Sequence, residues 1–371
     1  ESHGMLCSER EMGISNEQDG IIELPKDTPL GGPFASWLGL DDAMIEIAIT
    51  PNRQDCLGVR GIARDLAAAG IGSLKQLNIN SIPGSFLSPI DVNIGLANGV
   101  ADACPMFVGR YVRGVKNGPS PRWLQDRLSA IGLRPISALV DLTNYITYDL
   151  GRPLHVFDAD CVSGNIQVRL SQKGETLTAL NDRTYILDSE VTVIADDQVA
   201  LAMGGIIGGA ASGCTEMTTN VFIESALFDP IRTASTGRRY SIDSDARYRF
   251  ERGVDPSFAR QGLEFATQML MNLCGGEPSD VIVSGELPNW KHSITLRPSR
   301  VRCLGGIDIS LGKAQNILES LGFGVAVVDN NILATVPSWR SDIVEEVDLI
   351  EEIMRIYGFD QISSVSMPTT E

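Results

Sequence analysis

Two spacings of hydrophobic residues recur along the chain and predict its secondary structure. Residues 44–49 alternate between apolar and polar positions, which predicts a strand with three isoleucines on one face. Residues 258–273 repeat apolar positions at helical spacing before Gly275, which predicts an amphipathic helix. Short apolar runs predict further strands at 107–115, 166–170, 184–187, 191–195, 199–203 and 221–225. Strands outnumber helices without strict alternation, which favours an α+β fold of several domains.

Turn-forming residues divide the chain into segments. Proline and glycine are concentrated in residues 25–33 and end the first segment. A helix is predicted next, with Asp55 as its cap and Gly70 as its stop. The stretch SIPGSFLSP at 81–89 is typical of a linker, and a helix that begins with proline is predicted over 121–131.

The last part of the chain has the clearest pattern. It predicts a helix capped by Ser310, a hairpin that turns at residues 329–331, and a final helix from Asp342 to Tyr357 that Gly358 closes. Helix, hairpin and helix in this order suggest a small winged-helix-like domain. The final helix is strongly acidic, the wrong sign for a DNA groove, so we expect no DNA partner.

Composition narrows the class of protein. A chain of 371 residues is too long for one core and predicts two to four domains. No apolar run is long enough to span a membrane, so we expect no membrane partner. Seven scattered cysteines without a close pair predict neither a disulfide framework nor a zinc site, and they favour the reducing cytoplasm.

The net charge of −17 disfavours nonspecific binding of nucleic acid. Residues 232–253 are an exception, because they hold six arginines and three acids, for a local charge of +3. This arginine cluster could still steer the end of a nucleic acid. Alternatively, the arginines pair with the acids beside them on a solvated face.

Candidate chemistry is concentrated between residues 133 and 256. Glu224 is a single carboxylate in an apolar run, where it is costly unless it has a specific partner. It suits an acceptor for a ligand hydroxyl, or it pairs with a nearby arginine to hold the fold. His155, considered alone, is more often structural. Glycine pairs at 204–205 and 208–209 permit a close approach of backbone N–H groups to a ligand, although tight turns use the same residues.

Four sequence blocks in this region resemble the B3/B4 module of the β subunit of bacterial phenylalanyl-tRNA synthetase. The blocks are LRPISALVDLTNYITYDLGRPLHVFD (133–158), MGGIIGG (203–209), FIESALFDP (222–230) and GRRYSIDSDARYRFERGVDP (237–256). Outside them, SHGMLCSEREMG (2–13) is similar to the end of that subunit's OB-fold domain, IEIAITPNRQDCLGVRGIARDLAA (45–68) to part of its first domain, and VPSWRSDIVEEVDLIEEIMRIYGFDQI (336–362) to the close of its B5 domain.

The resemblance implies four parts and a central piece of the longer subunit. The expected parts are an OB-fold remnant (1–38), a B1-like α/β segment (39–80), a mixed-sheet B3/B4 editing domain (88–285) and a B5 domain (290–362). Because the chain opens on Glu1 and its first block is a partial barrel, we expect an excised fragment.

In that family the B3/B4 module hydrolyses tyrosine wrongly attached to tRNA(Phe). The resemblance implies catalytic roles for His155, Glu224 and Ser244. It implies substrate-binding roles for Arg134, Thr143, Asn144, Gly204, Gly205, Gly208 and Ala246. The family often has threonine where Ser244 stands, and serine keeps the hydroxyl. No nucleophile beside a base emerges, so direct attack by bound water is the expected route.

The resemblance also implies cofactors and partners. Mg²⁺ is expected at Asp342, Asp348, Glu351 and Glu352, near the α subunit of an α2β2 enzyme that binds tRNA(Phe). The alternative is a plain solvated acidic face. ATP is expected to be used by the α subunit, so this chain by itself should make no phenylalanyl-tRNA. Two other functions stay open: a noncatalytic scaffold for tRNA and the α subunit, and a free-standing editing-type protein.

Overall fold

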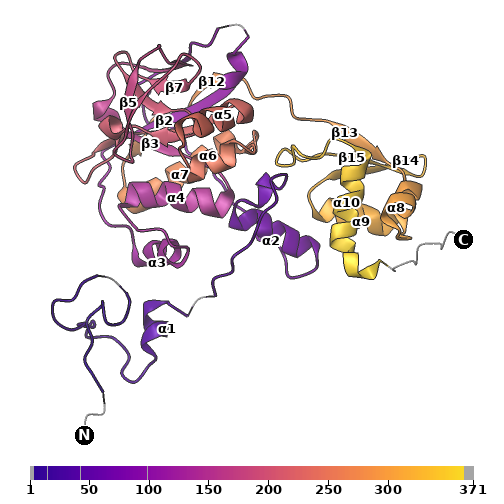
Figure 1. The fold of residues 1–371 in the computed structure, drawn as a ribbon, viewed down its shortest axis with the longest axis horizontal. Coiled ribbons are helices and arrows are strands. Elements are labelled where there is room, and N and C mark those ends of the chain that lie inside the picture. Colours follow the sequence, from indigo (N-terminus) through magenta and orange to yellow (C-terminus); the bar gives the residue numbers. More distant parts are fainter. Residues whose placement is uncertain (1–3, 15, 42, 98, 363–371) are drawn as a thin grey trace, which may run out of the picture. The chain divides into compact units, whose positions relative to one another are not determined.

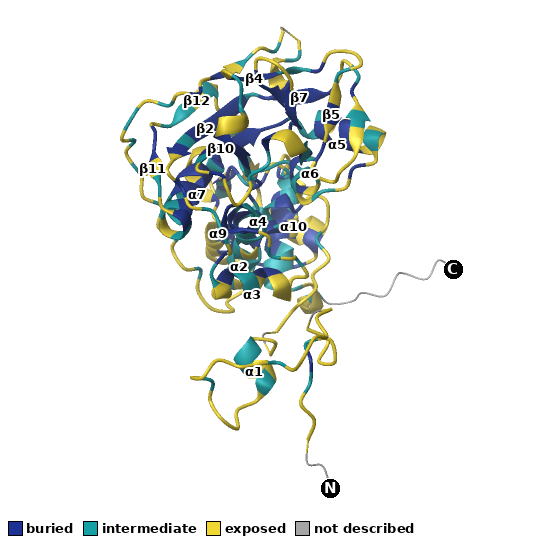
Figure 2. Cartoon of the chain, turned by 90° about the vertical axis from the view of Figure 1, so that its left-hand side faces the viewer, coloured by how far each residue is buried: buried dark blue, intermediate teal, exposed yellow. Residues whose placement is uncertain are grey.

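The computed structural model describes residues 4–14, 16–41, 43–97 and 99–362. The chain forms two compact units, one of residues 1–46 with 130–132, and one of residues 47–129 with 133–371. The first contains the short helix α1 (Phe34–Leu38) among turns, and its described residues are mostly exposed (Figure 2). The candidate chemistry lies in the second unit.

Two five-stranded sheets lie in the part of the second unit that carries the labels β2, β3, β7 and β12 in Figure 1. One has the order β1-β4-β7-β8-β9, and the other has the order β11-β2-β10-β3 with β12 also paired to β2. Their strands are β1 (Val92–Ile94), β2 (Met106–Arg113), β3 (His155–Asp158), β4 (Ile166–Leu170), β7 (Thr192–Ala195), β8 (Ala200–Met203), β9 (Ile207–Gly208), β10 (Asn220–Leu227), β11 (Glu277–Pro278) and β12 (Ile282–Gly285). A small hairpin joins β5 (Thr176–Thr178) to β6 (Thr184–Ile186).

Strand β10 separates two hydrophobic cores because its side chains alternate between the faces of its sheet. Val221 and Ile223 pack with helices α4 (Ala138–Leu150) and α7 (Phe258–Cys274) on one face. Phe222 and Ala226 point the other way, into a core shared with β4, β7 and β8. Glu224 has the same parity as Phe222, so its carboxyl group enters the layer between the two sheets. The remaining helices of this region are α2 (Val59–Ala68), α3 (Arg122–Ala130), α5 (Pro230–Tyr240) and α6 (Asp245–Phe250).

Residues 293–362 build their own core around a three-stranded sheet of order β13-β15-β14. The elements are β13 (Ser293–Leu296), α8 (Pro298–Gly305), α9 (Leu311–Ser320), β14 (Gly324–Val328), β15 (Asn331–Thr335) and α10 (Glu346–Tyr357). Asp329 and Asn330 both adopt positive φ between β14 and β15, the conformation that a tight hairpin turn requires.

The predicted α+β fold is confirmed, as are several element ends. Ser310 caps α9 by accepting a hydrogen bond from the Lys313 backbone N–H, and α7 and α10 end at Gly275 and Gly358. No helix of the described ranges combines the length and apolar character that crossing a bilayer demands.

Three local predictions were wrong. Residues 44–49 form no strand, because no strand of the described chain pairs with them. Asp55 does not cap α2, since its carboxylate is bound by Arg53 and Arg64, and Gly58 stands at the N-cap. Asp342 does not cap α10, because Arg340 occupies its carboxylate.

The observed cap of α10 is Glu345. It forms a capping box in which Asp348 accepts the backbone N–H of Glu345.

Candidate functional site

The candidate site begins where β10 and β3 pair. In their antiparallel register, Glu224 lies directly opposite His155, so these side chains share one face of the sheet. On its other side Glu224 faces Gly109 of β2, where no side chain competes for space. Strand pairing alone therefore brings together a carboxyl and an imidazole that are far apart in sequence.

Glu224 is buried with 6% of its surface exposed, and none of the described residues forms a hydrogen bond or ion pair with its carboxyl group. Burial raises the pKa of Glu224 to about 8, although the charge of Arg152 acts in the opposite direction. At neutral pH the group is therefore mostly a neutral acid, with a carbonyl oxygen that accepts and a hydroxyl that donates. The structure does not support the alternative in which Glu224 pairs directly with an arginine, because the nearby Arg152 binds Ser225 and two backbone carbonyls.

His155 also has an unpartnered polar atom, its ring nitrogen Nε2. Its Nε2 is buried and has no hydrogen bond within the described chain, and its ring packs edge-on against Phe157 at a centroid distance of 4.4 Å. Burial lowers the pKa of His155 to about 4, so the imidazole is neutral near pH 7. A neutral imidazole offers a hydrogen bond to a bound ligand or water without an added charge.

A cavity of about 70 Å³ opens between these two side chains and the facing sheet. At roughly 10–15 Å³ per water it has room for several water molecules. Its lining includes five residues named from the sequence, which are His155, Glu224, Gly205, Gly208 and Ala246. Ile206, Ile207 and Phe250 complete an otherwise apolar wall. We call this space the Glu224 pocket.

The other residues named from the sequence lie elsewhere. Arg134 is exposed, and Thr143 and Asn144 lie on α4 outside the pocket lining. Thr143 donates its hydroxyl proton to the Val140 carbonyl. Gly204 lines a separate small cleft beside Phe228.

The glycine pairs are required by close packing around the pocket. A methyl group at Gly208 would lie 2.4 Å from Cε1 of His155, so only glycine lets the imidazole occupy its place. Gly205 has positive φ, which favours glycine. The backbone N–H groups of Gly204 and Gly209 donate to Thr192 and Leu201, so neither is free to bind an oxyanion.

Ser244 supports the pocket from behind. Its hydroxyl donates to the Ile206 carbonyl at 2.6 Å and accepts from the Arg247 backbone N–H, which caps α6. Helix α6 in turn presents Ala246 and Phe250 to the pocket. These bonds suit a residue that holds the loop at Ile206 against α6.

Sequence reasoning missed Arg152, which immediately precedes Pro153 and Leu154 in the pocket wall. Arg152 is 1% exposed, and it donates to Ser225 Oγ, the Ala226 carbonyl and the Asp255 carbonyl. Burial lowers the pKa of Arg152 to about 10, while Asp255 and Glu224 act in the opposite direction. The only signal in the sequence was an arginine three residues before the candidate histidine.

The arginine cluster at 232–253 is largely neutralised within the protein. Five of its six arginines form ion pairs with acids: Arg232 with Glu190, Arg239 with Asp188, Arg247 and Arg252 with Glu251, and Arg249 with Asp245. Arg238 is exposed. The arrangement favours the solvated, paired face over a strong binding site for nucleic acid.

The four carboxylates named for Mg²⁺ do not fit a ready metal site in this arrangement. Asp342 and Glu352 both accept hydrogen bonds from Arg340, and Glu352 is also bound by Arg355. Asp348 accepts backbone N–H groups at the start of α10, while Glu351 is exposed. Arginine therefore supplies the positive charge that a cation would bring.

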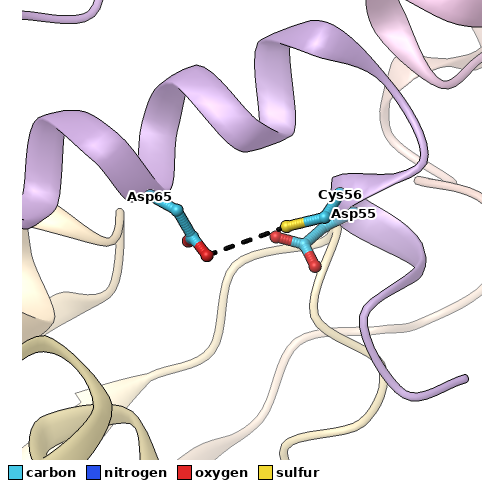
Figure 3. Close-up of side chains that lie close together, drawn as sticks. All are labelled: Asp55, Cys56 and Asp65. Atoms are coloured by element: carbon cyan, nitrogen blue, oxygen red, sulfur yellow. Dashed lines mark hydrogen bonds between the residues drawn. The ribbon is translucent and has the colours of Figure 1, made fainter. Parts of the chain in front are cut away.

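Among the described residues, one group of acids and cysteine comes together as metal ligands could: Asp55, Cys56 and Asp65 (Figure 3). The guanidinium of Arg53 already lies among them, with its Nη2 3.0 Å from Cys56 Sγ and 3.0 Å from Asp65 Oδ1. Burial and the charge of Asp55 raise the pKa of Cys56 to about 12, so the thiol stays protonated. This is an ion-pair cluster at the base of α2.

Comparison with known proteins identifies the class. The family model of the B3/4 domain matches residues 103–275, and that of the tRNA synthetase B5 domain matches residues 294–359. The chain thus combines two domains, and the Glu224 pocket lies within the first. The second domain matches a model that is described as a tRNA synthetase domain, so the chain contains a tRNA synthetase module.

The relatives define the particular family. The chain is 55% identical over 368 residues to the phenylalanine--tRNA ligase β subunit of Paramagnetospirillum magneticum, covering 99% of this chain and 46% of the relative. It is 53% identical to the β subunit of Rhodospirillum rubrum with the same coverage. The chain belongs to the phenylalanine--tRNA ligase β-subunit family, and it spans about half the length of the curated relatives that it matches.

A solved structure gives a more distant match. It is an N-terminal fragment of the phenylalanyl-tRNA synthetase β-subunit from Pyrococcus horikoshii, with 17% sequence identity and a TM-score of 0.43. The match covers 88% of this chain and 94% of the fragment.

Proposed function

We propose that the B3/4 domain of this chain hydrolyses tyrosyl-tRNA(Phe), and that the chain acts as part of a phenylalanine--tRNA ligase. One observation carries the proposal: the Glu224 pocket contains a buried carboxyl group for which the fold provides no partner. A group that is costly to bury suggests that its partner is a ligand. The relatives are β subunits of phenylalanine--tRNA ligase, an enzyme in which an aminoacyl-tRNA would be such a ligand.

We propose tyrosine as the amino acid that is removed because a phenylalanine-binding site rejects it poorly. A pocket built for phenylalanine discriminates weakly, by roughly a hundredfold, against an isostere that only adds a hydroxyl, so a second hydrolytic site is useful. That second site must require the hydroxyl. Glu224 would hydrogen-bond the phenol O–H of tyrosine, while phenylalanine would leave the buried carboxyl unpaired. The apolar wall from Ile206 to Phe250 would hold the ring.

In the proposed reaction, water attacks the ester carbonyl carbon and the bond to the ribose oxygen breaks. The products are tyrosine and tRNA, and a proton from water ends on the ribose hydroxyl. Neutral His155, with its unpartnered Nε2, would orient this water or the terminal ribose. The described residues around the pocket include no serine or cysteine nucleophile paired with His155, which supports direct attack by water.

The wider assignment is a proposal of the same kind. It includes the α subunit and tRNA(Phe) as partners, ATP as a substrate of the α subunit, and cytoplasmic location. It also keeps Mg²⁺ at Asp342, Asp348, Glu351 and Glu352 as a prediction for the assembled enzyme, where the bonds of Arg340 would have to change. No step of the hydrolysis above uses either cofactor.

A noncatalytic scaffold is the second candidate, and the neutralised arginine cluster favours it, since a site that binds and deacylates tRNA benefits from free positive charge. Replacement of Ala246 by Trp separates the two candidates. The indole would fill the Glu224 pocket, so we expect tyrosine release from tyrosyl-tRNA(Phe) to be abolished while circular dichroism shows a retained fold. The matched control is Tyr248→Trp, on the exposed face of the same helix.

Two results would count against the hydrolase. One is an Ala246→Trp variant that is folded and releases tyrosine as fast as wild type. The other is a wild-type chain that binds tRNA(Phe) but releases no tyrosine, which would support the scaffold.

A further inference from the structure

A larger cavity, of about 370 Å³, lies next to the Glu224 pocket along the chain. Residues 150–152 line this cavity, and residues 153–155 line the Glu224 pocket. Both spaces therefore share one continuous strip of main chain. The size lies within the usual range for small-ligand sites, roughly 300–1,000 Å³. We call this space the Arg152 cavity.

The walls of the Arg152 cavity combine an apolar surface with arginines. The apolar part is supplied by Leu74, Leu77, Ile79, Leu150, Val254 and Phe258. The charged part includes Arg60 and Arg64 on α2, Arg152, and the acids Asp55 and Asp255. A ligand that suits this lining needs a flat or apolar part and an anionic group.

The two acids are already committed to other groups. Asp55 is bound by Arg53 through both of its oxygens, and it also pairs with Arg64 at 3.4 Å. Asp255 accepts hydrogen bonds from the backbone N–H and the hydroxyl of Ser257, both at 2.9 Å. Neither carboxylate forms an ion pair with Arg60 or Arg152.

The two arginines form no ion pair with a described residue, although the charges of Asp255 and Glu224 act on Arg152 from a longer distance. Arg60 donates to the Lys75 carbonyl at 3.1 Å, and Arg152 donates to one hydroxyl and two carbonyls. Within the ranges that the structure describes, neither guanidinium lies within ion-pair distance of a carboxylate. A buried guanidinium without an anion is costly, and Arg152 is almost completely buried. The missing anion is the feature that points to a ligand.

We propose that the Arg152 cavity binds a phosphorylated nucleoside unit of the tRNA acceptor end, with the phosphate held by Arg60 and Arg152. The choice of RNA over a free nucleotide rests on the proposed function, because the ester cleaved in the Glu224 pocket is attached to the terminal ribose. A phosphate near that ribose must lie close to the pocket, and Arg152, which lines the cavity, directly precedes Pro153 and Leu154 of the pocket wall. The base would rest on the apolar wall.

This site would also reconcile RNA binding with the acidic character of the chain. The net charge of −17 repels polyanions over most of the surface. Two unpaired guanidinium groups in a recess would attract one phosphate locally while the surrounding charge discourages nonspecific contact. Binding would be specific for an end that enters the cavity and weak for RNA in general.

Calorimetric titration of the chain with the trinucleotide CCA tests the proposal. The comparison uses wild type, Arg60→Gln, and Arg302→Gln as a control for an exposed arginine on another domain. We expect Arg60→Gln to weaken binding at least fivefold and to reduce the slope of log K against log salt by about 0.7, the value for one phosphate contact on a single strand. Arg302→Gln should bind as wild type does.

Arg152 is tested by two variants, because loss of its buried charge can affect folding. Arg152→Lys keeps the charge and loses the fork of donors, so it should retain more affinity than Arg152→Gln. Adenosine monophosphate and inorganic phosphate are titrated in parallel. Equal affinity for adenosine monophosphate and CCA would assign the cavity to a free nucleotide and overturn the RNA assignment.

Two further results decide the matter. Unchanged CCA affinity in Arg60→Gln, or no CCA binding by wild type, would overturn the site. If wild type binds CCA through Arg60 but releases no tyrosine, the editing function fails while this site stands.

Discussion

Buried ionisable groups are paired in one region of the molecule and left unpaired in another. At the junction between α2 and α10, every buried charge has a partner of the opposite sign. In the Glu224 pocket, the buried acid has none. Both regions belong to the same compact unit of the chain. The difference in how their buried charges are paired is therefore a difference between two sites within one unit.

The junction is a continuous network of ion pairs. Arg340 and Arg355 both bind Glu352, Arg355 also binds Asp65, and Arg53 binds Asp65 from the other side. Burial alone would raise the pKa of Glu352, but hydrogen bonds from Arg355 and Arg340 lower it to about 2. The network thus joins α2, which precedes the B3/4 domain in sequence, to α10 of the B5 domain.

The difference separates structural charge from functional charge. In a network where every buried ion has a partner, the attraction between opposite charges offsets the cost of removing each ion from water. Removal of one ion leaves its partners buried without that attraction. Glu224 receives no such compensation and is kept neutral by its surroundings. A fold gains nothing from such a group, which is why its presence supports a role toward a ligand.

The largest expected effect comes from breaking the junction. Glu352→Ala would leave Arg340 and Arg355 buried without their shared carboxylate, so we expect the free energy of unfolding to fall by about 3–5 kcal/mol. Urea unfolding followed by circular dichroism measures this. Glu351→Ala, one residue earlier and exposed, should change stability by no more than about 0.5 kcal/mol. Equal effects of the two variants would contradict the network.

The pH dependence of stability tests the pocket side of the comparison. Glu224 has a pKa of about 8 in the folded chain and 4.5 when unfolded, so the folded state holds an extra proton between these values. Its contribution to stability is therefore lost as pH rises from 4.5 to 8, by up to about 1.4 kcal/mol per pH unit.

His155 acts in the reverse sense. Its pKa is about 4 when folded and 6.5 when unfolded, so its contribution is lost as pH falls from 6.5 to 4.

Urea unfolding at several pH values should show that Glu224→Gln removes the decline in stability between pH 6.5 and 8. A decline of the same slope in wild type and Glu224→Gln would refute the raised pKa.

A smaller effect of opposite sign is expected from an apolar replacement. Glu224→Leu removes an unpaired buried carboxyl, so we expect unchanged stability or a gain of about 1 kcal/mol at pH 7. Glu264 is the matched control, because it is equally buried but pairs with Arg110 at 2.9 Å. Glu264→Leu should destabilise the chain in the same urea assay. Loss of stability in both variants would show that Glu224 does have a structural partner.

The sequence predicted those features that depend on local pattern or on family motifs. The α+β fold, the cap at Ser310 and the stops at Gly275 and Gly358 follow from spacing and punctuation. His155 and Glu224 were selected from motifs, and their direct opposition depends on the register of β10 and β3, which single-sequence patterns do not specify.

The two wrong helix caps share one physical cause. Asp55 and Asp342 look like helix caps in the sequence, but arginines that are close in space bind their carboxylates instead. The role of Ser244 in the chemistry stays a prediction, and the structure adds that its hydroxyl is bonded to the Ile206 carbonyl and the Arg247 backbone N–H. Arg152 was missed because the absence of a partner is a property of three-dimensional packing.

The central claim is that Glu224 is left unpaired so that tyrosine can be its partner. The most direct test compares release of tyrosine and of phenylalanine from tRNA(Phe) by wild type and by Glu224→Ala. Without Glu224 the buried phenol hydroxyl loses its acceptor, which costs about 1–3 kcal/mol and predicts that tyrosine release falls by about one to two orders of magnitude while phenylalanine release changes little. A ratio of the two rates that is the same in wild type and Glu224→Ala would contradict the account.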